Sequence, residues 1–468
     1  MSVTGIERDD TQARKESGSF VDGVRRRLSQ ATRAILVQPD PVVTQREEAV
    51  APGQRIRQAD DRLRELEGLA QAIDLAVVRA QVLNLRHPRP ATFFGPGQVA
   101  RLAACVAATK AELVIVGSAL TPVQQRNLER ALACKVIDRT GLILEIFGAR
   151  AHTREGVLQV ELAHLAYQRS RLVRSWTHLE RQRGGFGFLG GPGETQIEAD
   201  RRQIDERMTR IRRQLRKVTR TRALHRRARQ EVPYPVVALV GYTNAGKSTL
   251  FNRLTAATVR AEDRLFATLD PTMRAVRIGP QERIILSDTV GFISDLPHGL
   301  VAAFRATLEE VTAADLVLHV RDITHPESEA QKGDVESVLD ELGVGPMHPG
   351  SPPVVEIWNK IDRLSDSRRR AAVLAQAEAT GAIPISALTG EGIDGLSAHL
   401  RARFTAAHTE LAVVLAAEET EAGAWLYAHG EVCEDRWRED GNRLMRVRLS
   451  PIARARWEKR FPTLAHDQ

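Results

Sequence analysis

The sequence predicts an α/β protein whose central domain is a mostly parallel sheet with helices on both faces. Short apolar runs alternate with helical patterns along most of the 468 residues. A glycine-rich loop at 241–248 separates the apolar run 236–240 from a helix that starts near 248–250. Several other polar motifs also directly follow apolar runs. Strands that alternate with helices form parallel sheets, and such sheets bind ligands at the carboxyl ends of their strands.

The loop at 241–248 has the P-loop pattern G-x-x-x-x-G-K-S. This pattern wraps backbone N–H groups around a phosphate at a helix N-terminus. Its lysine is expected to pair with the β- and γ-phosphates, and its serine to ligate Mg²⁺. One such motif can occur by chance in a chain of this length. We expect the whole loop to contact a nucleotide: Gly241, Tyr242, Thr243, Asn244, Ala245, Gly246, Lys247 and Ser248.

Two further motifs can complete the phosphate and magnesium site. Thr268 lies twenty residues beyond Ser248, where its hydroxyl can join the Mg²⁺ ligands. The apolar run 283–287 leads into Asp288, which can hold a water on the magnesium, and then to Gly291, whose amide can touch the γ-phosphate. The residues around these groups are also expected at the nucleotide: Phe266, Ala267, Leu269, Asp270, Thr289 and Val290.

Two later motifs point to guanine. The run 354–358 precedes Asn359, Lys360, Ile361 and Asp362, and 383–385 precedes the turn formed by Ser386, Ala387 and Leu388. The Asp362 carboxylate can accept hydrogen bonds from guanine N1–H and N2–H₂. Adenine would leave the carboxylate buried and unpaired, which gives a discrimination of about 10⁴-fold. Each motif alone is usually a surface turn. Five in this order, each after a strand, predict a GTP-binding domain over 233–405.

Hydrolysis at such a site depends on electrostatics and positioning, and we expect Lys247, Thr268 and Gly291 to carry it. Many small GTPases place a glutamine directly after the glycine to orient water, but Phe292 stands there. We therefore predict slow hydrolysis that a partner stimulates. Asn244 resembles the asparagine of potassium-stimulated GTPases, so K⁺ is a candidate second ion. A loop-stabilising role for Asn244 is an equally open interpretation.

The remaining chain divides into four further regions. Residues 1–30 are polar and expected to be disordered. Residues 31–153 predict a small α/β domain, 154–230 a helical hairpin, and 406–468 a strand–helix–strand–helix domain. The expected strands of the two outer domains are 34–37, 74–78, 113–116 and 135–137, then 411–415 and 443–449.

Cysteine usage and the distribution of apolar residues predict a cytoplasmic protein. The three cysteines have no metal-binding or redox spacing, which fits a reducing compartment. The N-terminal residues contain no apolar signal stretch, and no run approaches the length of a membrane span. We expect a monomeric protein that does not cross a membrane.

The hairpin is predicted from two apolar stripes with alternating steps of three and four residues. The first stripe is interrupted only by Arg169 and consists of Leu158, Leu162, Leu165, Leu172, Trp176 and Leu179. A second stripe extends from Ile197 to Val218. Such helices pack antiparallel as a coiled coil. Six glycines lie between 184 and 193 at the tip. They suit a flexible linker, or a tip that brings backbone close to a partner and offers Phe186 and Phe188 for stacking on bases.

Positive charge is concentrated in the hairpin. Residues 201–230 hold thirteen Arg or Lys against two acidic residues, a net charge of +11, while the whole chain carries +8, so all other residues together sum to −3. A basic helix is usually a solvated face, but so few acidic partners favour contact with phosphates. Structured RNA is the expected polyanion, and the charge pattern also allows DNA as the partner. The expected RNA contacts are Arg183, Phe186, Phe188, Arg212, Arg213, Arg216 and Arg220.

From about residue 31 to 460 the chain resembles the HflX family of translational GTPases. The most specific segments are LTPVQQRNLE at 120–129, DRT at 138–140 with Ile146-Phe147, QVELA at 159–163, GPGET at 191–195, and 241–252. The resemblance implies association with the large (50S) ribosomal subunit and its rRNA. It also implies a role in splitting or rescuing stalled ribosomes or in subunit biogenesis, with the hairpin near the peptidyl-transferase region.

Other functions remain open on the sequence. The chain can be an RNA-binding factor that GTP merely stabilises, without a role for hydrolysis. An RNA-modification GTPase is a weaker alternative, because the modification domain and terminal cysteine chemistry of that class are absent from this sequence. A second nucleotide in the N-terminal domain would rest on Gly95-Pro96-Gly97 alone, and a glycine turn explains that segment equally well.

Overall fold

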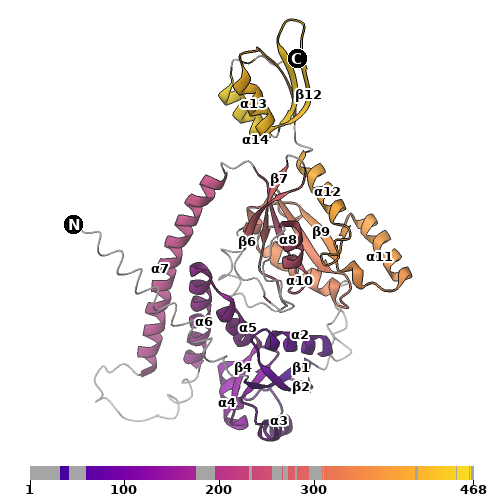
Figure 1. Cartoon of the computed structure of the whole chain (residues 1–468). Coiled ribbons are helices and arrows are strands. Elements are labelled where there is room, and N and C mark those ends of the chain that lie inside the picture. The colour runs from indigo at the N-terminus through magenta and orange to yellow at the C-terminus, as the bar shows by residue number, and fades with distance from the viewer. Residues whose placement is uncertain are drawn as a thin grey trace, which may run out of the picture.

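The computed structural model places the glycine-rich loop in a central domain that lies between two smaller ones (Figure 1). The fold class predicted from the sequence is confirmed: the central domain is flanked by an N-terminal α/β domain, a long helical hairpin and a small C-terminal α/β domain. The structure describes residues 32–41, 59–174, 196–230, 234–255, 266, 272–279, 282–294, 308, 310–405, 409–449, 451–462 and 464. The extension 1–30 and the glycine-rich tip lie outside these residues.

The N-terminal domain is a four-stranded parallel sheet in the order β2-β1-β3-β4. The strands are β1 (Arg33–Pro41), β2 (Ala76–Leu85), β3 (Leu113–Val116) and β4 (Lys135–Asp138). The second strand begins two residues later than expected, because Asp74 lies in a turn with φ of 57°. Buried aliphatic residues cover both faces of this sheet, as is usual for parallel strands.

Four helices cover this sheet, two on each face. One face packs against α2 (Ala59–Gln71) and α5 (Arg139–Arg150), the other against α3 (Pro96–Thr109) and α4 (Pro122–Leu132). Local sequence explains where two of them begin. Thr121 and Gln124 form a reciprocal capping box at α4, and Asp138 caps α5 by accepting from the Gly141 N–H at 2.8 Å.

The hairpin consists of α6 (Arg154–Arg174) and the 35-residue α7 (Gln196–Gln230). Both run along one side of the molecule (Figure 1). Leu158 and Leu165 pack against Met208 and Ile211, as the two stripes predict. The polar interruption at Arg169 is explained by its ion pair with Asp205 of α7, whose Nε and Oδ1 atoms are 2.6 Å apart. The expected stripe residues Trp176 and Leu179 lie outside the described part.

The central domain has a six-stranded sheet in the order β10-β9-β8-β5-β7-β6, parallel except for the edge strand β6. The strands are β5 (Val236–Val240), β6 (Thr272–Arg277), β7 (Arg283–Asp288), β8 (Leu316–Asp322), β9 (Val354–Asn359) and β10 (Ile383–Pro384). The helices around this sheet are α8 (Lys247–Thr255), α10 (Ser328–Glu341), α11 (Ser367–Thr380) and α12 (Ile393–Thr405).

The C-terminal domain corrects the strand–helix–strand–helix prediction. It contains β11 (Thr409–Leu415), α13 (Thr420–His429), β12 (Glu431–Trp437), β13 (Arg443–Leu449) and α14 (Pro451–Arg460). The unexpected strand β12 is an edge of the antiparallel sheet β11-β13-β12 and is mostly exposed. Its residues are largely charged and show no alternation of apolar and polar residues, so the periodicity that identifies strands is missing.

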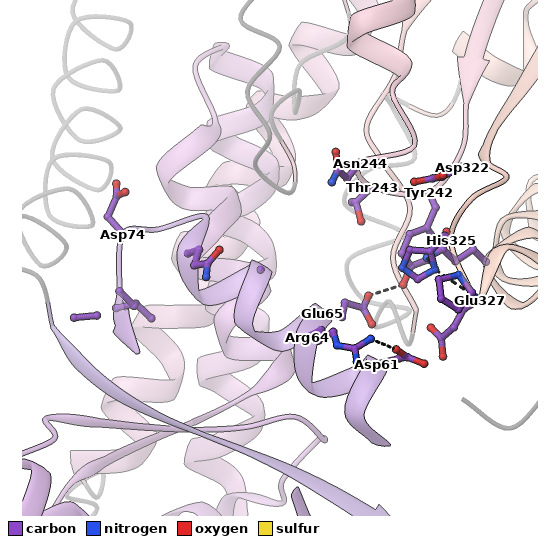
Figure 2. Close-up of a pocket in the computed structure, with 16 residues that line it drawn as sticks. Asp61, Arg64, Glu65, Asp74, Tyr242, Thr243, Asn244, Asp322, His325 and Glu327 are labelled. Atoms are coloured by element: carbon purple, nitrogen blue, oxygen red, sulfur yellow. Dashed lines mark hydrogen bonds and ion pairs between the residues drawn. The ribbon is translucent and has the colours of Figure 1, made fainter. Parts of the chain in front are cut away.

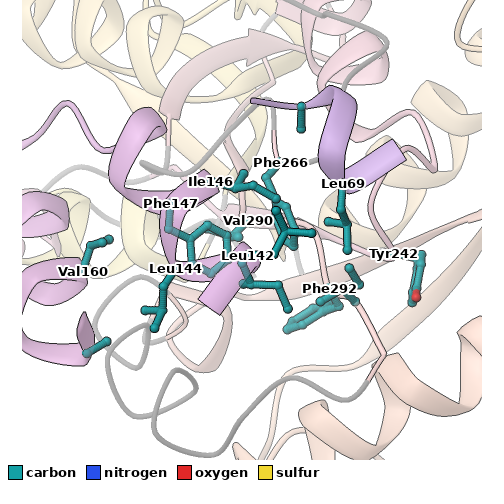
Figure 3. Packing of buried hydrophobic residues seen from close by; sticks show 14 of the residues in the cluster. Leu69, Leu142, Leu144, Ile146, Phe147, Val160, Tyr242, Phe266, Val290 and Phe292 are labelled. Atoms are coloured by element: carbon teal, nitrogen blue, oxygen red, sulfur yellow. The ribbon is translucent and has the colours of Figure 1, made fainter. Parts of the chain in front are cut away.

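An apolar core joins the N-terminal and central domains. Phe147 of α5 packs edge-on against Phe266, with ring centroids 4.7 Å apart, and Phe292 and Val290 lie in the same cluster (Figure 3). These side chains are almost fully buried. The segment after β7 therefore belongs to a core shared by two domains. Among the helices of the described part, none has the length and apolarity needed to cross a membrane.

Candidate functional site

The P-loop connects β5 to α8 at the carboxyl edge of the central sheet. Lys247 is buried, and its ammonium donates to the carbonyls of Gly241 at 3.0 Å and Tyr242 at 2.8 Å. Burial lowers the pKa of Lys247 to about 8, and the nearby Asp288 carboxylate opposes this shift. A buried ammonium at the start of a helix is suited to bind phosphate oxygens.

A magnesium ion fits the donors beside the lysine. Ser248 Oγ donates to Asp288 Oδ2 at 2.8 Å, and Asp288 is fully buried at the end of β7. Because the carboxylate accepts the serine proton, the lone pairs of the hydroxyl oxygen are available to a cation. Hydroxyl and carboxylate oxygens are the ligands that Mg²⁺ prefers, often through retained waters.

The segment after Asp288 is hydrogen-bonded to the P-loop. The Thr243 N–H donates to the Phe292 carbonyl at 2.7 Å, and the Phe292 N–H donates to the Gly241 carbonyl at 3.1 Å. A Cβ atom at Gly291 would lie 3.1 Å from Lys247 Nζ and 3.0 Å from the Thr243 Cα. This approach is open only to glycine, and it places the Gly291 backbone beside the ammonium expected to hold phosphate.

Side-chain hydrogen bonds connect the predicted guanine-binding segment 359–362 to the P-loop and to the turn at 386–388. Asn359 donates to the Ala245 carbonyl at 2.8 Å and accepts from the Ala387 N–H at 2.9 Å, so one side chain joins the P-loop to the last motif. Ser386 Oγ donates to Asp362 Oδ1 at 2.6 Å. These bonds bring the predicted base-reading carboxylate and its backing turn together.

Two residues that the sequence reasoning did not identify support this end of the site. Asp322, at the end of β8, forms an ion pair with Lys360 at 2.8 Å. Burial acts to raise the pKa of Asp322, but Lys360 and hydrogen bonds from Thr324 outweigh it, so the pKa is lowered. Arg253 of α8 donates to the carbonyls of Ala387 at 2.6 Å and Leu388. The sequence contained a signal for Asp322, because it is a polar residue at the end of the buried strand β8. Nothing in the sequence singled out Arg253.

Several predicted contacts are placed elsewhere by the structure. The Phe266 ring and the Val290 side chain are packed in the interdomain core, and a contact of either residue with a nucleotide stays a prediction. Thr289 donates to the Leu239 carbonyl at 2.6 Å and holds the sheet together. Leu388 is 68% exposed, and its contact with a base stays a prediction. Ala267, Thr268, Leu269 and Asp270 lie outside the described residues.

A cleft of about 1070 Å³ opens beside the P-loop (Figure 2). One wall is α2 of the N-terminal domain, and the other is formed by Tyr242, Thr243, Asn244 and the loop after β8. In Figure 2 the Glu65 carboxylate points at the Tyr242 side chain. The P-loop is therefore contacted by a domain that does not itself contain the nucleotide motifs.

The predicted RNA contacts are only partly described. Arg212, Arg213 and Arg216 are exposed on α7. Within the described part of the chain these three have no acidic partner, whereas Arg207 pairs with Glu161 of α6 at 2.5 Å. Arg183, Phe186, Phe188 and the side chain of Arg220 lie outside that part.

Models of four protein families match successive parts of the chain. Their descriptions are "GTP-binding GTPase N-terminal" for 60–148, "GTP-binding GTPase Middle Region" for 150–229, "50S ribosome-binding GTPase" for 236–360 and "HflX C-terminal domain" for 372–468. Their bounds differ from those of the domains described above at two points: the N-terminal model does not include β1, and the C-terminal model begins at 372, within α11 of the central domain.

Individual relatives match over most of their length. The chain is 53% identical to the GTPase HflX of Magnetococcus marinus, over 84% of this chain and 89% of that protein. It is 42% identical to the GTPase HflX of Escherichia coli, over 86% and 93%. A solved structure titled as a complex of SsGBP with GDP covers 79% of this chain and 97% of its own, at 23% identity and a TM-score of 0.45.

Proposed function

The chain belongs to the HflX family of GTPases, and from this premise we propose that it associates with the large ribosomal subunit and its rRNA. There it would act in splitting or rescuing ribosomes or in subunit biogenesis. The protein is a GTPase. The proposal concerns what hydrolysis of GTP to GDP and phosphate controls.

The observation that carries the proposal is the basic face of α7. Arg212, Arg213 and Arg216 are exposed on a long helix that is tethered to the rest of the molecule through α6. Arginines without acidic partners bind phosphate oxygens well, and their binding releases counterions from the nucleic acid. The description "50S ribosome-binding GTPase" for the family matched by the central domain supports the large subunit as the polyanion.

Mg²⁺ is the proposed cofactor. Ser248 and Thr268 would ligate it, Asp288 would hold one of its waters, and the ion would offset charge on the β- and γ-phosphates. Lys247 and the Gly291 amide would stabilise the transferred phosphoryl group, because phosphoryl transfer needs positioning and charge rather than covalent help. The bond from Ser248 to the buried Asp288 supports this assignment.

Slow hydrolysis with stimulation by the large subunit is the second part of the proposal. Its support is Phe292, whose side chain is 4% exposed and packs into the interdomain core. An apolar ring directed away from the phosphates cannot orient the attacking water. A group from the ribosomal subunit, or a rearrangement that the subunit causes, would have to supply that function.

K⁺ is the second ion of the proposal, with Asn244 as its expected ligand. Asn244 has φ of 59°, a left-handed conformation that asparagine tolerates better than most residues. The backbone therefore offers a reason for asparagine at this position that involves no ion. Equal hydrolysis rates in potassium and sodium buffers would remove K⁺ from the proposal. A cytoplasmic location is also proposed, and its support is that all three cysteines are free thiols, which fits a reducing compartment. That the protein is monomeric stays a prediction.

The direct test is sedimentation of the full chain, bound to a non-hydrolysable GTP analogue, with separated ribosomal subunits at graded salt. We expect binding to the large subunit only. Replacing Arg212, Arg213 and Arg216 with glutamine should lower the slope of log affinity against log salt by about two to three. Exposed Arg368 and Arg369 of α11 provide the matched control, whose replacement should not change the slope. Equal binding to both subunits would contradict the proposal.

Lys247→Ala distinguishes the proposal from a GTP-stabilised RNA-binding factor. The variant loses the buried ammonium and should neither hydrolyse GTP nor split ribosomes, as followed by light scattering. If Lys247→Ala splits ribosomes as fast as the original protein, the nucleotide has only a structural role.

A further inference from the structure

The second residue of the P-loop bonds to the N-terminal domain through its side chain. The Tyr242 hydroxyl donates to Glu65 Oε1 of α2 at 2.5 Å (Figure 2). The same hydroxyl accepts from the Ser294 N–H at 2.9 Å. Ser294 lies three residues beyond Gly291, on the segment that follows β7. A single hydroxyl thus connects the P-loop, this segment and a helix of another domain.

A second residue of the N-terminal domain completes the network. One nitrogen of Arg139, Nη2, lies 3.1 Å from Glu65 Oε1, 3.0 Å from Ser294 Oγ and 3.2 Å from the Ser294 carbonyl. The side chains of Arg139 and Glu65 are 7% and 13% exposed. A buried ion pair adds little stability, because desolvation offsets the attraction. In some proteins a buried ion pair instead specifies one arrangement of the groups around it, and this is the role that we infer for Arg139 and Glu65.

Arg139 is itself held in a fixed position. It is the first residue of α5, directly after the buried cap residue Asp138. Asp138 accepts hydrogen bonds from the Tyr167 hydroxyl and Arg171 Nη2 of α6, each at 2.7 Å, and from the Leu120 N–H at 3.1 Å. The start of α5 is therefore anchored on several sides, which makes Arg139 a rigid support for Ser294.

The supported segment is the one that must meet the γ-phosphate. Phe292 pairs with the P-loop through two backbone bonds, and Gly291 lies beside the Lys247 ammonium. Ser294 is held two residues beyond Phe292 by Arg139, Glu65 and Tyr242. Catalysis by positioning needs such groups placed closely before the reaction, and a displacement of about 1 Å can lower a rate about 100-fold.

We propose that Arg139 and Glu65, supplied by the N-terminal domain, are positioning residues for GTP hydrolysis. They act through Ser294 and Tyr242 and hold Gly291 where its amide can reach the γ-phosphate. Neither residue touches the reacting atoms. This proposal rests on GTP hydrolysis alone and not on the ribosomal role.

The test is steady-state GTP hydrolysis by the full chain without ribosomes. Arg139→Ala and Glu65→Gln should each lower kcat about tenfold or more. The KM for GTP and the affinity for GDP should stay within about twofold, because an interaction needed only in the transition state affects kcat. Arg139→Lys keeps the charge near Glu65 but cannot reach both Ser294 oxygens as well, so its kcat should lie between those of Arg139→Ala and the original protein.

Tyr242→Phe keeps the test informative if the charge variants fold poorly, because it removes one hydroxyl and keeps the ring. It should also lower kcat. In the double variant with Arg139→Ala, the fold decrease in kcat should be smaller than the product of the two single decreases, because both residues act in one network. Arg150→Ala is the matched control, because Arg150 lies on the same helix and donates within its own domain, to Ala72. Its kcat should not change.

Three results would overturn the proposal. The first is an unchanged or raised kcat in a folded Tyr242→Phe or Arg139→Ala variant. The second is a loss confined to KM. The third is a double variant whose effects multiply fully, which would mean that the two residues act independently.

Discussion

Asp362 accepts a hydrogen bond from Ser386 at 2.6 Å, which holds one of its oxygens in place before any base arrives. Ser386 also accepts from the Thr389 N–H at 3.1 Å, and Arg253 bonds to the carbonyls of the same turn. At the scale of single residues, the carboxylate that we propose for base recognition is therefore oriented by neighbours from a later motif. A pre-oriented carboxylate discriminates strongly, because a wrong base leaves it unpaired.

We predict that Asp362→Asn changes the preferred nucleotide from guanosine triphosphate to xanthosine triphosphate. The asparagine amide cannot accept from both guanine donors, so GTP affinity should fall by about 10³-fold or more. Xanthine has a carbonyl where guanine has its amino group, and the amide N–H can donate to it. Calorimetry with both nucleotides measures the exchange. Asp366→Asn is the control, because Asp366 only caps α11 and asparagine caps equally well. Unchanged GTP affinity in Asp362→Asn would refute this role for the carboxylate.

At the scale of elements, β8 shows how a fully buried strand positions the site. All seven of its residues are buried, including His319, Arg321 and Asp322. Arg321 forms ion pairs with Glu329 of α10 at 2.5 Å and Glu356 of β9 at 2.6 Å. These bonds satisfy charges inside the domain and leave Asp322, at the strand end, facing Lys360. The strand thus connects a buried polar network to the predicted guanine-binding segment through Lys360.

His319 makes the stability of this element depend on pH. Burial, with further contributions from the Arg321 and Lys332 charges, lowers the pKa of His319 to about 3, although Glu356 acts in the opposite direction. The histidine is neutral in the fold and becomes protonated in the unfolded chain below its ordinary value of 6.5. The neutral histidine favours the fold above pH 6.5, and stability is lost as the pH falls toward 3.

We predict that lowering the pH from 7 to 5 costs the central domain about 2 kcal/mol through His319. His319→Gln should lose less stability than the original protein over the same interval. Thermal unfolding at both pH values measures the difference. The exposed His399 of α12 provides the control, because His399→Gln should leave the pH dependence unchanged. Equal pH dependence of the original protein and His319→Gln would contradict the prediction.

At the scale of the whole molecule, the N-terminal and central domains share one core. Phe147, Phe266 and Phe292 come from distant parts of the chain and pack together (Figure 3). Cores are packed as densely as organic crystals, so a displaced side chain shifts its neighbours. A change on the N-terminal side of this core is therefore expected to reach the segment that carries Gly291.

We predict that Phe147→Ala and Phe94→Ala destabilise the N-terminal domain similarly but differ at the nucleotide. Both rings are fully buried, and truncation should cost about 3–5 kcal/mol in each case. Phe94 packs on the opposite face of the sheet, against Phe93. Only Phe147→Ala should lower kcat for GTP hydrolysis at a temperature where both variants are folded. Equal rates in the two variants would show that the shared core does not affect the site.

The sequence by itself determined the nucleotide chemistry, because each motif is local. The phosphate loop, Asp288 and the Asn359–Asp362 segment each follow a strand, and parallel strands bring such ends to one edge whatever the details of packing. Apolar periodicity likewise determined the hairpin, because pairing of the two stripes is the way to bury them. The charged edge strand β12 carried no such pattern and was missed.

Only the tertiary structure showed that the N-terminal domain contacts the segment after Asp288. Glu65 and Arg139 lie 177 and 103 residues before Tyr242 in the numbering, and neither belongs to a motif that predicts contact with a nucleotide. Contacts between domains depend on how whole surfaces fit together, and a linear pattern does not encode that fit. For the same reason Phe266, which the sequence places beside the nucleotide, is buried against Phe147.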